Sequence, residues 1–281
     1  MRWRKIGIIM GGGALPIRLA EACASRDRPF VPIRLVGFAD EAAQALGGYD
    51  LHLGEAGKLV RILKETECDA VTLAGVVPRP DFSQLKLDWR AAAVLPRLVA
   101  AAAGGDGAIL SVIVDAFEAE GYKVIGADEV AADLAAGAGV LGAHAPSEAD
   151  MEDIRKAARL ISAIGPFDVG QAAVVSGGLV LAVEAAEGTD GMLARCAMLP
   201  EPVRGGQGPR GVLLKRPKPG QELRVDLPTV GVKTIEGAAA AGLAGVAVEA
   251  GRSLLMDAPA AIAAADDAGL FIFGFRASDF D

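Results

Sequence analysis

The first residues of the chain combine an apolar segment, three consecutive glycines and an amphipathic segment. Residues 5–10 are apolar after the initial lysine and predict a buried strand. Gly11–Gly13 follow directly, and apolar residues then recur at helical spacing over residues 15–23. Pro16 falls in the first turn of this helix, where its missing N–H group costs nothing. A strand, a glycine turn and a helix form the beginning of a βαβ unit, which favours a parallel sheet covered by helices.

Strand and helix signals continue to alternate through the first half of the chain. We expect strands at 30–36, 70–73 and 123–125 and helices at 58–66 and 109–120. The pattern therefore predicts an α/β fold, with an N-terminal Rossmann-like parallel sheet that carries helices on both faces.

A change of pattern suggests a second domain. Residues 133–146 are rich in alanine and glycine and lose the periodicity, so we interpret them as a linker. We accordingly expect an N-terminal Rossmann-like domain at 1–132 and a C-terminal α/β domain at 147–281. A length of 281 residues is sufficient for two such domains, each with its own core.

The C-terminal half predicts a mixed sheet with helices. Ser147 and Asp150 have the spacing of a capping box, which would begin a helix that runs to Ile164. We expect two hairpins, one at 169–184 and one that ends at 252–256. The remaining expected elements are strands at 211–214, 223–227, 245–249 and 270–273 and helices at 189–196, 234–241 and after Asp257.

Composition excludes several classes of protein. The net charge of −8 provides no basic field for nucleic acid, so we expect no nucleic-acid partner. The 3 cysteines are far apart and form no CxxC motif, which argues against a disulfide framework or zinc site and favours the reducing cytoplasm. We find neither a signal peptide nor an apolar run long enough to span a membrane, and expect a soluble protein.

The stretch from 215 to 229 places cations beside one carboxylate. Lys215, Arg216 and Lys218 precede Asp226, which lies between apolar residues before a proline. Leucine and valine alternate with charged residues over 223–227 and predict a strand that ends near Asp226. Cations beside a carboxylate suit a site for phosphate and a divalent metal. A solvated basic hairpin is the alternative interpretation.

Two loops that follow strands could bind phosphate. Gly11–Gly13 would let backbone amides approach an anion at a helix N-terminus, although a tight turn that needs glycine for packing explains the triplet as well. Gly75 and Arg79 follow the strand at 70–73, and the carboxyl ends of parallel strands share one edge. Arg79 could therefore pair with a diphosphate, or could belong to a surface loop stiffened by its neighbouring prolines.

The segment from 184 to 192 carries a second group of polar residues. Thr189 would begin a helix, where its hydroxyl could cap the helix or contact a phosphate oxygen. Gln171 lies on the paired strand and could reach this loop. Glu187 and Asp190, with Asp226, supply the hard oxygen ligands that magnesium accepts. Alternatively, these acids only favour the dipole of a capped helix.

Several motifs in order resemble the LpxI family, the UDP-2,3-diacylglucosamine pyrophosphatases of lipid A synthesis. The motifs are Gly11-Gly-Gly-Ala-Leu-Pro16, Ala74-Gly75, Asp168-Val-Gly-Gln171, Val183-Glu-Ala-Ala-Glu-Gly-Thr-Asp190, Gly211-Val-Leu-Leu-Lys-Arg-Pro-Lys-Pro-Gly-Gln221, Asp226-Leu-Pro-Thr229 and Glu249-Ala-Gly251. The resemblance spans nearly the whole chain. Family members commonly carry alanine in place of Met10.

The resemblance implies a Mg²⁺-dependent hydrolase that cleaves UDP-2,3-diacylglucosamine to UMP and 2,3-diacylglucosamine 1-phosphate. It also implies two domains that close over the substrate and hold its acyl chains in an apolar groove. Asp226 and Lys215 become the catalytic candidates, and Asp226, Glu187 and Asp190 the metal-ligand candidates. The substrate-binding candidates are Gly12, Gly13, Gly75, Arg79, Gln171, Thr189 and Thr229.

Other interpretations remain open at this stage. A non-catalytic carrier of a lipid-linked nucleotide sugar would bind the same molecule without cleaving it. A Rossmann-type dinucleotide oxidoreductase would use Asp40 for the ribose, although the chain lacks GxGxxG.

We further expect peripheral contact with the inner membrane, and exposed sheet edges in the second domain would suit a homodimer.

Overall fold

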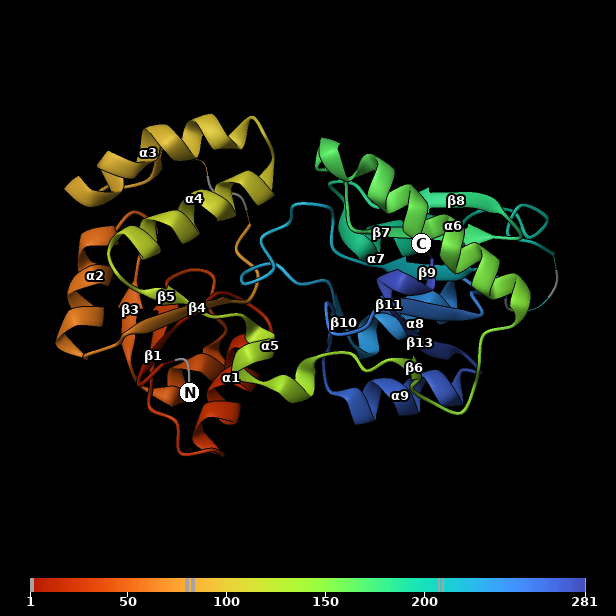
Figure 1. The fold of residues 1–281 in the computed structure, drawn as a ribbon, viewed down its shortest axis with the longest axis horizontal. Helices are drawn as coiled ribbons and strands as arrows, with labels where there is room; N and C mark the ends of the chain where they lie inside the picture. Colours follow the sequence, from red (N-terminus) through yellow and green to blue (C-terminus); the bar gives the residue numbers. More distant parts are fainter. Residues whose placement is uncertain (1–2, 79–80, 82–83, 207, 209, 281) are drawn as a thin grey trace. The chain divides into compact units, whose positions relative to one another are not determined.

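The computed structural model describes residues 3–78, 81, 84–206, 208 and 210–280 (Figure 1). The chain forms two compact units. The first, here the N-terminal unit, comprises Met1–Ala132 together with Glu222–Asp226. The second, the C-terminal unit, comprises Asp133–Gln221 and Leu227–Asp281. Each unit has its own sheet and core, as expected for an α/β chain with a Rossmann-like first half and a mixed second sheet.

The N-terminal unit contains a parallel five-stranded sheet with the order β3-β2-β1-β4-β5. Its strands are β1 (Ile6–Met10), β2 (Phe30–Leu35), β3 (Tyr49–Leu51), β4 (Ala70–Ala74) and β5 (Lys123–Val124). The strand order changes direction between β1 and β4. Ligands of open parallel sheets bind beyond the carboxyl ends of strands at such a point, which is where the two glycine loops begin.

Helices lie on both faces of this sheet. They are α1 (Leu15–Ala24), α2 (Ala56–Glu65), α3 (Trp89–Ala102), α4 (Asp106–Ala119) and α5 (Ala127–Val130), with a 3₁₀ turn η1 (Glu41–Leu46). Ile9 packs in one core with residues of α2 and α4. Ile6 and Ile8, at alternate positions of β1, point to the opposite face, and both are fully buried. The predicted strands at 5–10, 30–36, 70–73 and 123–125 are confirmed, whereas β3 and α3 were not predicted.

The C-terminal unit contains a mixed six-stranded sheet with the order β6-β13-β11-β9-β7-β8. Its strands are β6 (Gly139–Val140), β7 (Ala172–Ser176), β8 (Leu179–Val183), β9 (Val212–Lys215), β11 (Gly245–Glu249) and β13 (Phe271–Phe275). The three central strands β13, β11 and β9 are parallel, and β6, β7 and β8 pair antiparallel with their neighbours. Residues 133–146, expected to form a linker, contain a 3₁₀ turn η3 (Ala132–Leu134) and β6.

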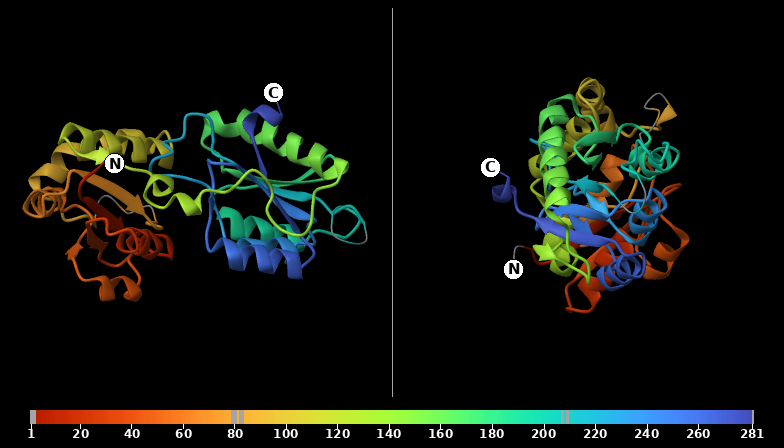
Figure 2. Two further views of the ribbon diagram at one scale, coloured as in Figure 1. Left: turned by 60° about the horizontal axis from the view of Figure 1, so that its bottom comes forward. Right: turned by 90° about the vertical axis from the view of Figure 1, so that its right-hand side faces the viewer.

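Two layers of helix enclose the C-terminal sheet, and Figure 2 shows them from two further directions. The helices are α6 (Glu148–Ile164), α7 (Gly188–Ala197), α8 (Val232–Ala240) and α9 (Ala258–Asp267), with 3₁₀ turns η4 (Gly165–Phe167) and η5 (Ala277–Asp279). Helix α6 packs in one core and α7, α8 and α9 pack in the other. The predicted capping box is confirmed, because the Ser147 hydroxyl accepts from Asp150 N–H and the Asp150 carboxylate accepts from Ser147 N–H.

The first hairpin is also confirmed and has an additional support. Strands β7 and β8 pair antiparallel across Gly177 and Gly178. The buried carboxylate of Asp153, on α6, accepts the N–H groups of these two glycines at 2.8 and 2.7 Å. Both N–H groups of the turn are thereby hydrogen-bonded.

The predicted strand at 223–227 is wrong. Val225 and Asp226 both direct their N–H groups to the carbonyl of Glu222, so the segment is a turn. Arg224 explains this conformation, since its guanidinium contacts the Glu222 carboxylate at 2.7 Å and the Glu118 carboxylate at 2.6 Å. Val225 packs against the core of the N-terminal unit. These long-range contacts outweigh the local alternation of apolar and charged residues.

The second predicted hairpin, which was to end at 252–256, is wrong as well. Strand β11 already has β9 and β13 on its two sides, so no edge is left for a hairpin partner. Strand β12 (Leu254–Leu255) pairs instead in parallel with β10 (Thr229–Val230). The N–H of Leu254 donates to the carbonyl of Pro228, and this pairing holds the Thr229 segment in place.

Candidate active site

Polar side chains of the C-terminal unit gather at one edge of its sheet. Lys215 is the last residue of β9, and Glu249 is the last residue of the parallel strand β11. Strand β7 runs antiparallel to β9, so Gln171, which precedes β7, is at this same edge. Glu184 follows β8 and is therefore at this edge too. The topology thus brings together residues that are far apart in sequence.

Lys215, Thr189 and Glu184 form a connected chain of hydrogen bonds. The Lys215 Nζ donates to the Thr189 Oγ1 at 2.8 Å, and Thr189 Oγ1 donates to Glu184 Oε1 at 2.6 Å. An ammonium group only donates and a carboxylate only accepts, so the single hydroxyl proton must point to Glu184. Lys215 is 5% exposed and Glu184 6% exposed. This chain holds a lysine charge at a fixed position at the sheet edge.

Gln171 and Thr229 complete this group. The N–H of Gln171 donates to Glu184 Oε2 at 2.8 Å, and its carbonyl accepts from Arg216 N–H at 3.0 Å. The carbonyl of Thr229 accepts from Lys215 Nζ at 3.0 Å. The structure therefore brings together four of the predicted residues, Lys215, Thr189, Gln171 and Thr229. The expectation that Gln171 lies beside the 184–192 loop is confirmed.

The expectation that Thr189 caps its helix is wrong. Glu187 is the N-cap residue of α7, and this helix has no side-chain cap hydrogen bond. The Thr189 hydroxyl is engaged with Lys215 and Glu184 instead. A buried carboxylate and a buried ammonium compete for the hydroxyl more strongly than the backbone amides of the first turn.

A second buried carboxylate belongs to one of the family motifs but was not predicted as a site residue. Glu249 is 1% exposed and contacts Arg216 at 2.9 Å and Arg252 at 2.9 Å. Arg216 directly follows Lys215, and the two cations have different partners. Arg216 contacts Glu249, whereas Lys215 contacts Thr189, which is hydrogen-bonded to Glu184. The sequence signal for this residue was a glutamate at the end of the predicted strand 245–249. A buried acid requires a partner, so its position indicated a cation nearby. Lys218 pairs with Asp168 at the same edge.

The glycine loops of the N-terminal unit contact one another directly. Gly12 and Val76 exchange two backbone hydrogen bonds, of 2.9 and 2.8 Å. The N–H of Gly11 donates to the carbonyl of Ala74. The N–H of Gly13 donates to Asp40 Oδ2 at 2.9 Å, so a carboxylate lies where an anionic ligand could approach the start of α1. These contacts also fit the interpretation of the triplet as a tight turn.

Gly75 is the position where this close approach most requires glycine. Its φ of +91° is unfavourable for other residues, and a Cβ atom would lie 2.5 Å from the carbonyl oxygen of Gly12. We expect Gly75→Ala to lower the free energy of unfolding by about 1–3 kcal/mol more than Gly37→Ala, because of the added overlap. Gly37 has a similar φ of +85° with no atom within 4 Å of the Cβ position. Urea denaturation of both variants measures the difference, and equal losses would contradict a packing role for Gly75.

The three proposed metal ligands have different surroundings. Glu187 and Asp190 are exposed and form ion pairs, Glu187 with Arg195 at 2.7 Å and Asp190 with Lys233 at 2.6 Å. A backbone hydrogen bond and the contact with Arg195 lower the pKa of Glu187. Asp226 is half-buried and belongs to the segment that packs with the N-terminal unit. In the described part of the chain, no three histidine, cysteine or acidic side chains form a group that could hold a metal ion. Arg79 lies outside the described residues.

Comparison with known proteins identifies the family of both units. Residues 5–134 match the LpxI N-terminal domain, and residues 137–273 match the LpxI C-terminal domain. A protein of Caulobacter vibrioides named UDP-2,3-diacylglucosamine pyrophosphatase LpxI is 52% identical over 272 residues, which cover 96% of this chain and 97% of the relative. The helices within the described ranges include none with the length and apolar character needed to cross a bilayer. The chain belongs to the LpxI family.

Proposed function

We propose that this protein hydrolyses the diphosphate bond of UDP-2,3-diacylglucosamine, releasing UMP and 2,3-diacylglucosamine 1-phosphate for lipid A synthesis. The observation that carries the proposal is the 52% identity, over 96% of the chain, to a relative named for the pyrophosphatase. The buried lysine at the sheet edge supports it, because a diphosphate ester resists attack through the repulsion of its own negative oxygens. A fixed ammonium group offsets this repulsion.

Each site residue has a proposed role in this reaction. Lys215 neutralises charge on the diphosphate, and Thr189 and Glu184 hold its ammonium group in position. Asp226 orients or deprotonates the attacking water. The proposed substrate contacts are Gly12, Gly13, Gly75, Arg79, Gln171, Thr189 and Thr229.

Magnesium is the proposed cofactor. Carboxylate oxygens and phosphate oxygens are the ligands that Mg²⁺ prefers, and the ion commonly binds through one or two carboxylates together with substrate phosphates. Asp226, Glu187 and Asp190 are the proposed carboxylate ligands, and Glu187 and Asp190 each form an ion pair. A bound Mg²⁺ would withdraw charge from the diphosphate and lower the pKa of a coordinated water.

We also propose a cytoplasmic location, peripheral contact with the inner membrane and a homodimer.

One assay tests the function against its two alternatives. Purified protein is incubated with UDP-2,3-diacylglucosamine and magnesium, and then with an excess of EDTA. We expect release of UMP that stops when the metal is removed. Tight binding without UMP release would instead identify a carrier. The oxidoreductase alternative has less support, because Asp40, which would hold the ribose, is bonded to Gly13 N–H.

A further inference from the structure

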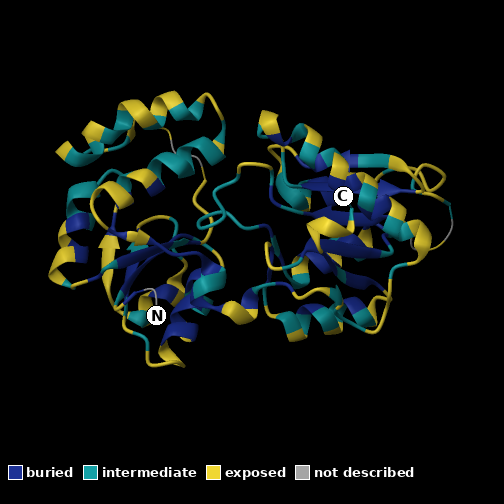
Figure 3. Cartoon of the chain, viewed as in Figure 1, coloured by how far each residue is buried: buried dark blue, intermediate teal, exposed yellow. Residues whose placement is uncertain are grey.

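Five residues from the second half of the chain belong to the N-terminal unit. Glu222–Asp226 joins this unit, whereas Gln221 and Leu227 on either side belong to the C-terminal unit. All five residues are half-buried and carry the intermediate colour in Figure 3. We call residues 222–226 the inserted segment. Asp226, the residue proposed to act on the attacking water, is therefore held in place by contacts with the first half of the chain.

Arg224 closes the turn of the inserted segment. Its Nε and Nη2 atoms donate to the two oxygens of the Glu222 carboxylate at 2.8 and 2.7 Å. The N–H groups of Val225 and Asp226 donate to the carbonyl of Glu222 at 3.2 and 3.1 Å. A bidentate pair of this kind fixes the plane of the guanidinium as well as its position, so its remaining nitrogen points in a defined direction.

The remaining nitrogen reaches helix α4. Arg224 Nη1 donates to Glu118 Oε1 at 2.6 Å, across 106 positions of sequence. Val225 packs against the core that contains Phe117, the neighbour of Glu118 on α4. A Cβ atom at Gly126, which follows β5, would lie 3.6 Å from Arg224 Cα. Because β5 is the parallel neighbour of β4, the inserted segment lies at the sheet edge where the glycine loops begin.

We propose that Arg224, through Glu118, is a positioning residue that fixes the carboxylate of Asp226 at this sheet edge. The inference rests on the proposed function, which assigns Asp226 to the attacking water. A group that acts on water must be held within about 0.5 Å, and a shift of about 1 Å can cost roughly 100-fold in rate. An exposed ion pair alone contributes little, but a guanidinium already fixed by Glu222 meets Glu118 without further ordering.

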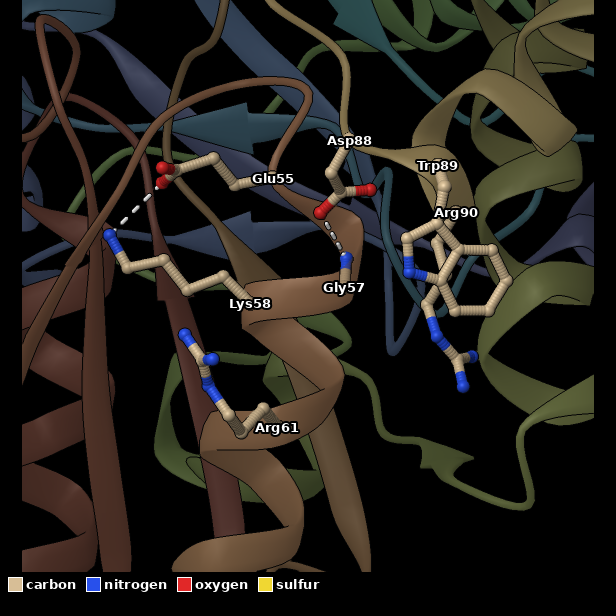
Figure 4. A pocket seen from close by; sticks show the side chains of 7 residues that line it. All are labelled: Glu55, Gly57, Lys58, Arg61, Asp88, Trp89 and Arg90. Carbon is tan, nitrogen blue, oxygen red and sulfur yellow. Dashed lines mark hydrogen bonds and ion pairs between the residues drawn. The ribbon is translucent and has the colours of Figure 1, made fainter.

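Other carboxylates of the same unit hold the starts of helices instead. Two of them line a pocket of about 460 Å³, shown in Figure 4. Glu55 accepts from Lys58 Nζ at 3.1 Å, and Asp88 caps α3 and also accepts from the N–H of Gly57 at 2.6 Å. Glu118 differs from both, because it lies near the end of α4 and holds a segment from the second half of the chain. Its role is therefore not that of a helix cap.

The first test measures the inserted segment without any substrate. Deuterium exchange of the full chain reports the amides of Val225 and Asp226, which are bonded to the Glu222 carbonyl. We expect Arg224→Gln to speed their exchange about 10-fold, because the turn opens more often. Unchanged exchange in this variant would show that the arginine does not hold the segment, and would overturn the proposal.

The second test is steady-state release of UMP from UDP-2,3-diacylglucosamine. Arg224→Gln should lower kcat about 30-fold and leave KM within about 3-fold, since orienting the water is not required for binding. Arg224→Lys should recover only part of the loss, because an ammonium group cannot reproduce the bidentate geometry. Glu118→Gln should lower kcat about 5-fold, and adding it to Arg224→Gln should cause no further loss, because both remove the same contact.

Arg97→Gln is the matched control. Arg97 pairs with Asp115, one turn before Glu118 on α4, and this ion pair joins α3 to α4. Its loss should leave both the exchange of the inserted segment and kcat at the wild-type level.

Three kinetic outcomes would contradict the proposal in different ways. Wild-type kcat in Arg224→Gln despite faster exchange would overturn the positioning role and leave the proposed function intact. A raised KM in Arg224→Gln, together with wild-type kcat in Glu118→Gln, would assign the arginine to the substrate itself and overturn positioning. A wild-type protein that releases no UMP would overturn the proposed function, and the positioning role with it.

Discussion

Replacement of Asp226 by alanine should reduce kcat for UMP release by on the order of 100–1,000-fold, the typical cost of removing a group that acts only in the transition state. Asp226 lies directly after the turn anchored by Arg224 and Val225. Its substitution leaves both anchors in place. We therefore expect the variant to fold, to melt near the wild-type temperature and to bind UDP-2,3-diacylglucosamine.

Asp115→Asn is the control for this variant. Asp115 carries a side chain that is 61% exposed and pairs with Arg97 on the surface of the same unit, so the loss of its charge should leave kcat within a few-fold of wild type. Steady-state release of UMP in detergent micelles measures both variants, and isothermal titration measures binding. Turnover at the wild-type rate in Asp226→Ala would remove this carboxylate from the mechanism.

The anchoring of Asp226 shows why its local structure could not be predicted. The alternating sequence at 223–227 is typical of a strand, but Arg224 finds Glu118, more than a hundred positions earlier in the chain. Hydrogen bonds to the Glu222 carboxylate and to Glu118 raise the pKa of Arg224. In return, the Arg224 guanidinium holds the pKa of Glu222 below its usual range. Such pairing depends on tertiary structure and leaves no periodic signal.

The fold was predictable where one local pattern determined each element. Strand β1 carries no polar side chain and β11 carries only the glutamate at its end, and both strands are wholly buried. The capping box at Ser147 and the glycine turn after Ser176 set the ends of their elements through contacts between near neighbours. Strand β12 was assigned to the wrong partner because the occupancy of both edges of β11 is a property of the whole sheet.

The candidate site was predictable in part for a topological reason. Lys215 was placed directly after a strand, Gln171 on a hairpin strand and Thr189 at the start of the helix that follows this hairpin. The sheet order then brings these segments to one edge. Glu184 was noted only as the end of a strand, although it holds both Thr189 and Gln171. The bond from Gly13 to Asp40 was not predictable, because it joins loops that follow different strands.

Lys215→Met should cause the second large loss, with kcat/KM lower by on the order of 100-fold. Methionine keeps much of the apolar length of lysine but removes the charge that we assign to the diphosphate. It also leaves the Thr229 carbonyl without this donor, at a cost of about 1–3 kcal/mol in unfolding free energy. The thermal midpoint should therefore fall while the protein stays folded at the assay temperature.

Two further variants separate a role in charge from a role in stability. Lys156→Met makes the same substitution at an exposed lysine that contacts the Gly178 carbonyl, at the opposite end of β7 and β8, and should leave kcat/KM unchanged. Thr189→Val keeps the ammonium charge but removes the hydroxyl between Lys215 and Glu184. We expect its loss in kcat/KM to be smaller than that of Lys215→Met. If Lys215→Met were destabilised as expected yet cleaved substrate at the wild-type rate, the lysine would be structural, and the charge that offsets the diphosphate would have to come from another cation.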